Sequence, residues 1–265
     1  MQENNEKQKQ VSVLWETCWL LDNHNTDRET TWSKMEKANT KDLFVWSLQN
    51  GVQIKGLTMK NFPCSGRGVM TTRFVNKNDL IISIPRDFLI TFDTVLSYLK
   101  KSKCAKTLVV SSKLTAKDLF LLFLVLERRN NNTSRYTSKY RIYVNSVPDV
   151  YTTPCYIPQN EIELLPQFLK EEVEDQLSKI NRHYTRLMNN KKIICDCTLL
   201  NCEQNICYED VKWAWNIINT RSVYFSSKHL NCEQDAVLGV REVNFALAPL
   251  LDMLNHQSSA QVHTL

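Results

Sequence analysis

The sequence predicts an α+β protein, with β-structure near both ends of the chain and a long helical region between them. Two short runs rich in branched apolar residues, within residues 69–84, are separated by turn residues, which is typical of strands. After Thr91 the apolar residues recur at helical spacing as far as Thr220. The 265 residues are enough for one large domain or two small ones.

The N-terminal third holds the first expected elements. Residues 1–40 are polar and rich in Asn and Thr, and we expect a poorly ordered extension with one short helix. Leu43 to Leu48 form a short amphipathic segment that ends at Asn50-Gly51. We then expect a β-hairpin, in which strands at 69–74 and 80–84 flank a turn at 76–79.

The middle of the chain is predicted to be helical. The patterns indicate four helices, at residues 94–99, 116–128, 161–187 and 208–220. A polar loop at 128–139 follows the second of them. The longest apolar run, Leu119 to Leu126, is too short to span a bilayer, and no segment resembles a signal peptide. Nine cysteines in such a chain favour reduced thiols, and hence the cytosol or nucleus.

Several residues are chemical candidates, each with an ordinary structural alternative. Gly66-Arg67-Gly68 allows close backbone approach to a ligand, or is a tight turn. Arg221 follows a largely apolar helix and could face a carboxylate or phosphate, or cap the helix. Asp252 and His256, four residues apart, would share one face of a helical turn, and His256 would suit acid–base chemistry or metal binding, whereas a lone His is more often a partly buried structural residue.

A cysteine cluster offers a second kind of site. Cys195, Cys197 and Cys202, with Cys207 beyond, have spacings at which thiolates can bind zinc, but the neighbouring Ile and Leu residues suit buried, reduced cysteines equally well.

In order along the chain, GRGVMTTRFVNKNDLIISIP, a helical insertion, NTRSVYF and LAPLLDMLNH resemble the SET-domain protein-lysine methyltransferases. The subclass is the split-SET group that includes the RuBisCO large-subunit methyltransferase. The resemblance implies small β-sheets with a knot-like crossing, split by the insertion. It divides 41–265 into an N-terminal SET part (41–93), the insertion (94–207) and a C-terminal SET part (208–265), incomplete at its end.

The same resemblance implies S-adenosylmethionine as cofactor. Backbone groups around Ser65, Gly66 and Arg67 would contact it, and Arg221 would face its carboxylate. The adenosine side would be lined by the segment Asp252, Met253, Leu254, Asn255 and His256. The family's post-SET zinc cysteines follow the core, whereas these precede Asn-His, so we expect no metal.

The resemblance implies methyl transfer to a lysine of a histone or another protein, in the cytoplasm and nucleus, with neither nucleic acid nor membrane as a direct partner. The family's catalytic tyrosine lies some tens of residues after Asn-His, so we expect a fragment or truncated isoform that carries no catalytic residue of its own. The alternative is a catalytically inactive, SET-derived binding module.

Overall fold

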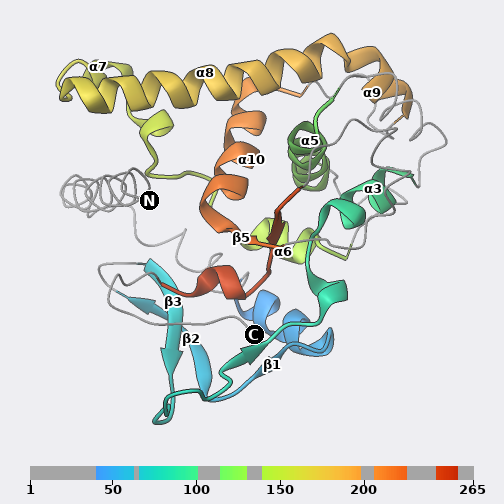
Figure 1. Cartoon of the computed structure of the whole chain (residues 1–265), viewed down its shortest axis with the longest axis vertical. Coiled ribbons are helices and arrows are strands. Elements are labelled where there is room, and N and C mark those ends of the chain that lie inside the picture. Colours follow the sequence, from blue (N-terminus) through green and yellow to red (C-terminus); the bar gives the residue numbers. More distant parts are fainter. Residues whose placement is uncertain are drawn as a thin grey trace. The chain divides into compact units, whose positions relative to one another are not determined.

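A helix with a long apolar centre, α5 (Ala116–Arg129), forms the core of the fold. Its residues Leu119 to Leu126 are all 7% exposed or less, so this helix must be enclosed on every side. Three helices pack against it: α3 (Phe92–Lys100), α6 (Arg141–Ser146) and α10 (Tyr208–Arg221) (Figure 1). The helices predicted at 94–99, 116–128 and 208–220 are therefore confirmed.

This computed structural model describes residues 40–62, 66–100, 114–129, 139–197, 206–225 and 243–255. The chain forms two compact units. The larger comprises Asn39–Val147 and Ile180–Leu265, and the smaller Met1–Ala38 and Pro148–Lys179. The predicted N-terminal extension, apart from Thr40, and most of the polar loop lie outside the described residues. No described helix has the length and apolar character needed to cross a bilayer.

The predicted amphipathic segment near residue 43 is confirmed, because residues 40–49 are helical. Leu43 is fully buried, and the ring of Trp46 packs 4.5 Å from that of Phe88, centroid to centroid. The side-chain amide of Asn50 donates to the carbonyl of Trp46, and Gly51 leaves the helix with φ +87°. This is the positive φ at which glycine commonly ends helices.

The described strands form three antiparallel pairs within the larger unit. β1 (Gln53–Ile54) pairs with β4 (Ile82–Ser83), and β2 (Leu57–Phe62) pairs with β3 (Gly66–Thr71). β5 (Ser222–Tyr224) pairs with β6 (Phe245–Leu247). With the surrounding helices, these small sheets make an α+β fold, so the predicted fold class is confirmed.

The predicted β-hairpin is wrong in its pairing. The turn itself is present: Asp79 N–H donates to the Asn76 carbonyl, and Asn78 has φ +69°. However, β3 and β4 on either side of it each pair with a strand that precedes them in the chain. The reason is β2, LTMKNF, which the sequence reading did not recognise as a strand and which occupies the hydrogen-bonding edge of β3.

β6 joins early and late parts of the chain. Besides pairing with β5, it exchanges two backbone hydrogen bonds with Ile90, at 2.9 and 3.0 Å between Leu247 and Ile90. Ile90 and Leu247 are both fully buried. The segment after β6 therefore starts from a fixed position in the core.

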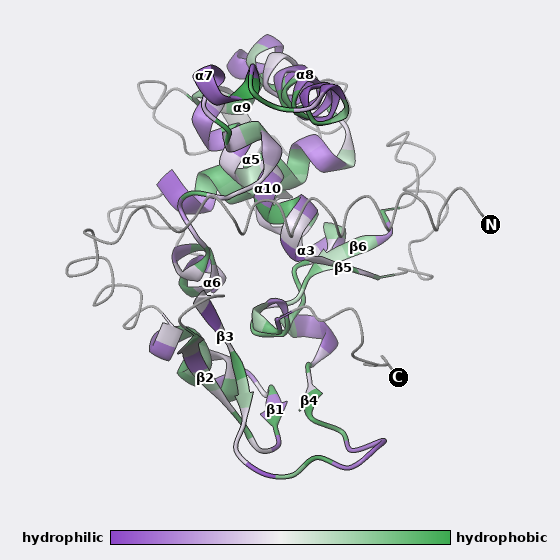
Figure 2. Ribbon diagram, turned by 90° about the vertical axis from the view of Figure 1, so that its left-hand side faces the viewer, coloured by the Kyte–Doolittle hydropathy of each residue, from purple (hydrophilic) through white to green (hydrophobic). Residues whose placement is uncertain are grey.

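The predicted single helix at 161–187 is two helices. α7 (Gln159–Ile162) ends before Pro166, and α8 (Gln167–Asn189) starts after it, since proline lacks the N–H that a helix interior requires. α8 is amphipathic and largely hydrophilic (Figure 2). The short helices η3 (Pro154–Tyr156) and α9 (Lys191–Cys197) precede and follow this pair.

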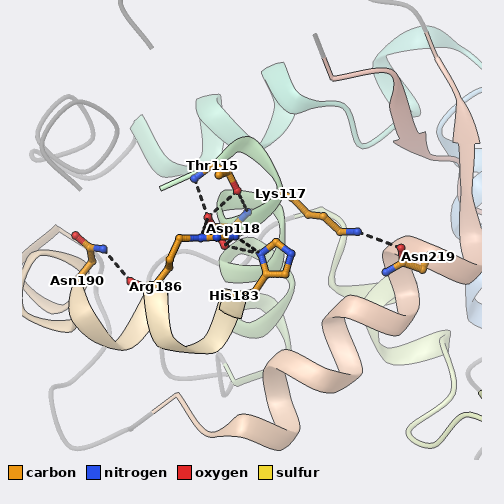
Figure 3. A network of polar contacts seen from close by, with 7 residues as sticks. All are labelled: Thr115, Lys117, Asp118, His183, Arg186, Asn190 and Asn219. Carbon is orange, nitrogen blue, oxygen red and sulfur yellow. Dashed lines mark hydrogen bonds and ion pairs between the residues drawn. The ribbon is translucent and has the colours of Figure 1, made fainter. Parts of the chain in front are cut away.

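A buried aspartate on α5 attaches the C-terminal part of α8 to the core (Figure 3). The Asp118 side chain is fully buried. Its carboxylate accepts hydrogen bonds from His183 Nδ1 at 2.6 Å, from Arg186 Nε at 2.9 Å and from the hydroxyl and backbone N–H of Thr115. Burial alone would raise the pKa of the Asp118 carboxyl, but these hydrogen bonds outweigh it and hold that pKa below its usual value.

We expect Asp118→Asn to lower the free energy of unfolding at pH 7 by about 3 kcal/mol, because it leaves Arg186 without its buried counter-ion. Since the folded-state pKa of Asp118 lies below the unfolded value of 3.8, this contribution is fully present above pH 3.8 and is lost as the pH falls below it. Urea unfolding at pH 7 and at pH 3 measures both effects.

Asp175→Asn is the matched control for this measurement. Asp175 lies on α8 and pairs with Lys179, but both side chains are about half exposed. We expect a change of about 0.5 kcal/mol or less. Equal losses for the two variants would contradict a special role for Asp118.

Candidate functional site

A buried ion pair joins the end of α10 to the turn after β6. Arg221 is the last residue of α10, and Asp252 lies in the short helix η4 (Leu251–Met253). Arg221 NH1 donates to Asp252 Oδ2 at 2.9 Å and to the Asp252 carbonyl at 3.4 Å. The two side chains are 15% and 0% exposed. Arg221 does face a carboxylate, as its position at the helix end suggested, and this carboxylate belongs to the chain itself.

The sequence analysis missed a third member of this cluster, Tyr143 of α6. Its hydroxyl lies 3.0 Å from Asp252 Oδ2 and donates to it, and the whole residue is buried. In Figure 1, α6 lies between α10 and the strands β2 and β3. No signal in the sequence distinguishes Tyr143 from an ordinary core tyrosine.

Asp252 is held in an environment that disfavours its charge. Burial raises the pKa of its carboxyl above the usual value, and the opposing effects of Arg221, Tyr143 and Arg67 do not restore it. Its Oδ1 atom is buried and has no hydrogen-bond partner among the described residues. A buried, incompletely paired carboxylate is costly for stability and is characteristic of functional sites.

The turn that presents Asp252 has unusual backbone geometry. Leu250, which is buried, has φ +76°, a value rare for a residue with a side chain. From there a single 3₁₀ turn carries Asp252, and Leu254 is already extended. The helical turn that carries Asp252 ends at Met253, and His256, which we expected on the same face as Asp252, lies outside the described residues.

The segment Gly66-Arg67-Gly68, for which we expected close backbone approach to a ligand or a tight turn, forms the start of β3. Gly66 is the first residue of β3 and has φ +68°, and Gly68 is buried within the strand. A Cβ atom on Gly68 would lie 2.5 Å from Asn255 Oδ1. The absence of a side chain at Gly68 is therefore what allows the Asn255 amide to lie against β3.

The Arg67 side chain points to other parts of the larger unit. Its NH1 donates to the Ser146 carbonyl of α6 at 2.6 Å and to Thr40 Oγ1 at 3.3 Å. The resemblance implied a cofactor contact through the backbone of Arg67, which lies in β3, and not through its side chain.

The structure thus brings four of the nine predicted residues, Arg221, Asp252, Met253 and Asn255, into two adjoining groups. Gly68 meets Asn255, Arg221 meets Asp252, and β3 packs against η4. Met253 is buried, with its sulfur 4.0 Å from Arg221 NH1. Leu254 is half-buried, whereas Ser65 and His256 lie outside the described residues. Cofactor contact by these residues stays a prediction.

The cysteine cluster falls largely outside what the structure describes. The backbone of Cys195 and Cys197 belongs to α9, but their side chains and the whole of Cys202 are not described, and Cys207 is exposed at the start of α10. Within the described residues, no group of three His, Cys, Asp or Glu side chains is arranged to hold a metal ion.

Comparison with known proteins gives relatives over most of the chain. SET domain-containing protein 4 of Artemia parthenogenetica is 27% identical over 225 residues, which is 84% of this chain and 51% of that protein. The protein of the same name from Homo sapiens is 27% identical over 230 residues, 87% of this chain and 50% of that protein. Actin-histidine N-methyltransferase of Homo sapiens is 26% identical over 81% of this chain and 34% of its own. No family model matches the chain.

Solved structures agree with these relatives. The SET domain of LSMT bound to lysine and AdoHcy superimposes with a TM-score of 0.62 at 19% identity, over 85% of this chain and 45% of that one. Rubisco LSMT bound to AdoMet gives a TM-score of 0.61, also at 19% identity, over 84% of this chain and 46% of that one.

The chain has the SET-domain fold. The resemblance to split-SET methyltransferases drawn from the ordered motifs is confirmed by the relatives and by the shared fold. The chain spans about half the length of the curated relatives named SET domain-containing protein 4.

The raised pKa of Asp252 predicts an unusual pH dependence of stability. Between 3.8, the unfolded value, and the raised folded value, the native state binds a proton that the unfolded state does not. The unfolding free energy of the wild type should therefore fall, relative to Asp252→Asn, as pH rises through this window, by up to about 1.4 kcal/mol per pH unit. Urea unfolding of both proteins between pH 4 and 8 measures the difference.

Asp118→Asn serves as the comparison, since its difference from the wild type should stay level over the same pH range. A wild type that gains stability over Asp252→Asn with rising pH would overturn the prediction for Asp252.

Proposed function

We propose that this SET-domain chain binds S-adenosylmethionine and belongs to a protein-lysine N-methyltransferase that acts in the cytoplasm and nucleus. The supporting observation is the contact of Gly68 with Asn255 beside the buried Arg221–Asp252 pair. These residues come from β3, α10 and the segment around η4, which are separate in the sequence. Arg221, Asp252 and Asn255 were cofactor candidates, and Gly68 directly follows the candidate Arg67.

The residues present fit such a ligand in two respects. The Asn255 amide, which occupies the space left by the missing Cβ of Gly68, offers a donor and an acceptor to polar groups of a ligand. Asp252 Oδ1 is a buried acceptor with no described partner, and the Arg221 guanidinium beside it has several N–H groups with which to bind a ligand carboxylate.

In this proposal the backbone of Ser65, Gly66 and Arg67 and the side chains of Arg221 and Asn255 bind and orient the cofactor, and Met253, Leu254 and His256 line the same pocket. When bound, the cofactor supplies a methyl group on a sulfonium, ready for transfer to a neutral amine. In the family, a lysine channel that excludes water favours an uncharged lysine amine and good alignment with the methyl group.

The proposed substrate is a lysine of a protein, with histones as the first class to test. The relatives named as actin-histidine N-methyltransferases make histidine the second candidate. A SET-derived binding module that holds the cofactor without transferring a methyl group is the alternative from another functional class.

Calorimetric titration with S-adenosylhomocysteine tests cofactor binding. Asn255→Ala removes an amide that pairs with ligand polar groups, so we expect binding to weaken roughly fivefold to 150-fold, which corresponds to about 1–3 kcal/mol. Gly68→Ala should also weaken binding, because its Cβ would displace the Asn255 amide.

Gly51→Ala is the matched control for Gly68→Ala. Gly51 has a positive φ at the end of the helix over residues 40–49 and is not a cofactor candidate, so alanine there should cost about 1 kcal/mol of stability through the backbone and leave binding unchanged. Tight binding that survives both Asn255→Ala and Gly68→Ala would reject Asn255 as a cofactor contact. Failure of the wild type to bind would reject the proposed function.

Labelled S-adenosylmethionine incubated with core histones tests the substrate, and the test uses a protein extended to the full length of the relatives, because the chain as given is expected to carry no catalytic residue. Methyl-lysine in the hydrolysed protein supports the proposed target, whereas methyl-histidine replaces it with the second candidate. Cofactor binding without any labelling favours the binding module.

A further inference from the structure

Helix α6 of the insertion contacts both parts of the candidate site. Its Ser146 carbonyl accepts a hydrogen bond from Arg67 of β3, and its Tyr143 hydroxyl donates to Asp252 of η4. Within the helix, Ser146 Oγ donates to the Tyr143 carbonyl at 2.7 Å. Figures 1 and 2 both place α6 between β3 and the helices α5 and α10. One short helix is thus bonded to the two segments that meet at Gly68 and Asn255.

The geometry at Asp252 gives Tyr143 a defined task. Tyr143 and Arg221 both donate to the same oxygen, Oδ2, at 3.0 and 2.9 Å. Two donors from different helices fix the rotation of the carboxylate and turn Oδ1 the other way. The Tyr143 ring is fully buried, so the position of its hydroxyl is set by core packing.

We propose that Tyr143 is a positioning residue of the cofactor site: its hydroxyl orients the Asp252 carboxylate, which in turn holds the Arg221 guanidinium in the position that receives the ligand. The proposal rests on the proposed function. It assigns a role at the site to the helical insertion, whose sequence carries none of the site motifs.

The charge of Asp252 is the quantity through which Tyr143 acts. The groups that face this carboxylate are Arg221 from α10, Tyr143 from α6 and, at longer range, Arg67 from β3. The tyrosine hydroxyl donates to the ionised carboxylate, so it favours the charged form that attracts Arg221. Without this hydroxyl, Asp252 takes up a proton at a higher pH and releases Arg221.

Tyr143→Phe removes the hydroxyl and keeps the buried ring. Carbon-13 NMR of protein labelled at the aspartate carboxyl carbons follows the titration of Asp252, whose resonance is identified by its loss in Asp252→Asn. We expect the midpoint to rise by about one pH unit in Tyr143→Phe, the shift that one hydrogen bond of average strength produces. This readout needs no ligand.

Calorimetric titration with S-adenosylhomocysteine, over the pH range in which the NMR signal of Asp252 titrates, measures the consequence for binding. Affinity should fall as the pH is lowered through the Asp252 midpoint, and the fall should begin at a higher pH in Tyr143→Phe. At a pH near the wild-type midpoint, we expect roughly threefold to tenfold weaker binding than in the wild type. In the Asp252→Asn background, Tyr143→Phe should have no further effect on the pH profile.

Tyr140→Phe is the matched control. Tyr140 directly precedes the same helix and is nearly buried, and its hydroxyl donates to the Asp87 carbonyl at 3.3 Å, away from Asp252. We expect it to lower stability without moving the Asp252 midpoint or the pH profile of binding. This separates positioning from a general loss of stability.

Three results overturn the proposal. An unmoved Asp252 midpoint in Tyr143→Phe shows that the hydroxyl does not act on the carboxylate. A displaced midpoint with an unchanged pH profile of binding shows that Asp252 does not govern the ligand. If Tyr143→Phe displaces the midpoint but the wild type binds no S-adenosylhomocysteine, the Tyr143–Asp252 link stays in place. Both the proposed function and the role of Tyr143 at its site are then rejected.

Discussion

The buried ion pair between Arg221 and Asp252 is the constraint that the C-terminal part of the fold must satisfy. A carboxylate with a fully buried side chain is tolerated only if donors reach it, so the end of α10, the η4 turn and α6 must come within hydrogen-bond distance of one point. The positive φ of Leu250 serves the same end, because it turns the chain from β6 into η4. The contact between Gly68 and Asn255 then lies immediately beyond this turn.

Asp118 and Asp252, whose side chains are both fully buried, show how the number of donors decides the outcome. Asp118 accepts hydrogen bonds from His183, Arg186 and Thr115 through both of its oxygens, and the pKa of its carboxyl falls despite burial. Asp252 uses one oxygen for Arg221 and Tyr143, and burial prevails, so its pKa rises. The first arrangement stabilises the attachment of a helix, and the second keeps a strained charge where a ligand is proposed to bind.

Much of the fold could be predicted from local patterns. The buried face of α5 and the helix over 208–221 follow from apolar spacing, and the turn at Asn76 to Asp79 follows from its residue types. Strand pairing could not be predicted, because the partner of β3 is β2, whose sequence LTMKNF shows no strict alternation. Pro166 marked a helix boundary that periodicity alone passed over.

The candidate site was only partly accessible from the sequence, for a physical reason. Gly66, Arg221 and Asn255 belong to motifs whose order along the chain carries the family resemblance. Tyr143 lies in a segment whose buried residues, Tyr140, Tyr143, Val144 and Val147, have ordinary core spacing. The spacing indicates that the Tyr143 ring is buried, but it does not indicate that the Tyr143 hydroxyl donates to the Asp252 carboxylate, 109 residues away.

The long sequence separations at α6 have a consequence for folding. Arg67 and Ser146 are 79 residues apart, and Tyr143 and Asp252 are 109 apart, whereas α3, α5 and α6 pack together and follow one another in the chain. Closing such long loops costs chain entropy before any contact compensates for it, so these contacts form late. The helices α3, α5 and α6 can therefore assemble first, and the region around Asp252 completes the native state when β3, α6 and η4 come together.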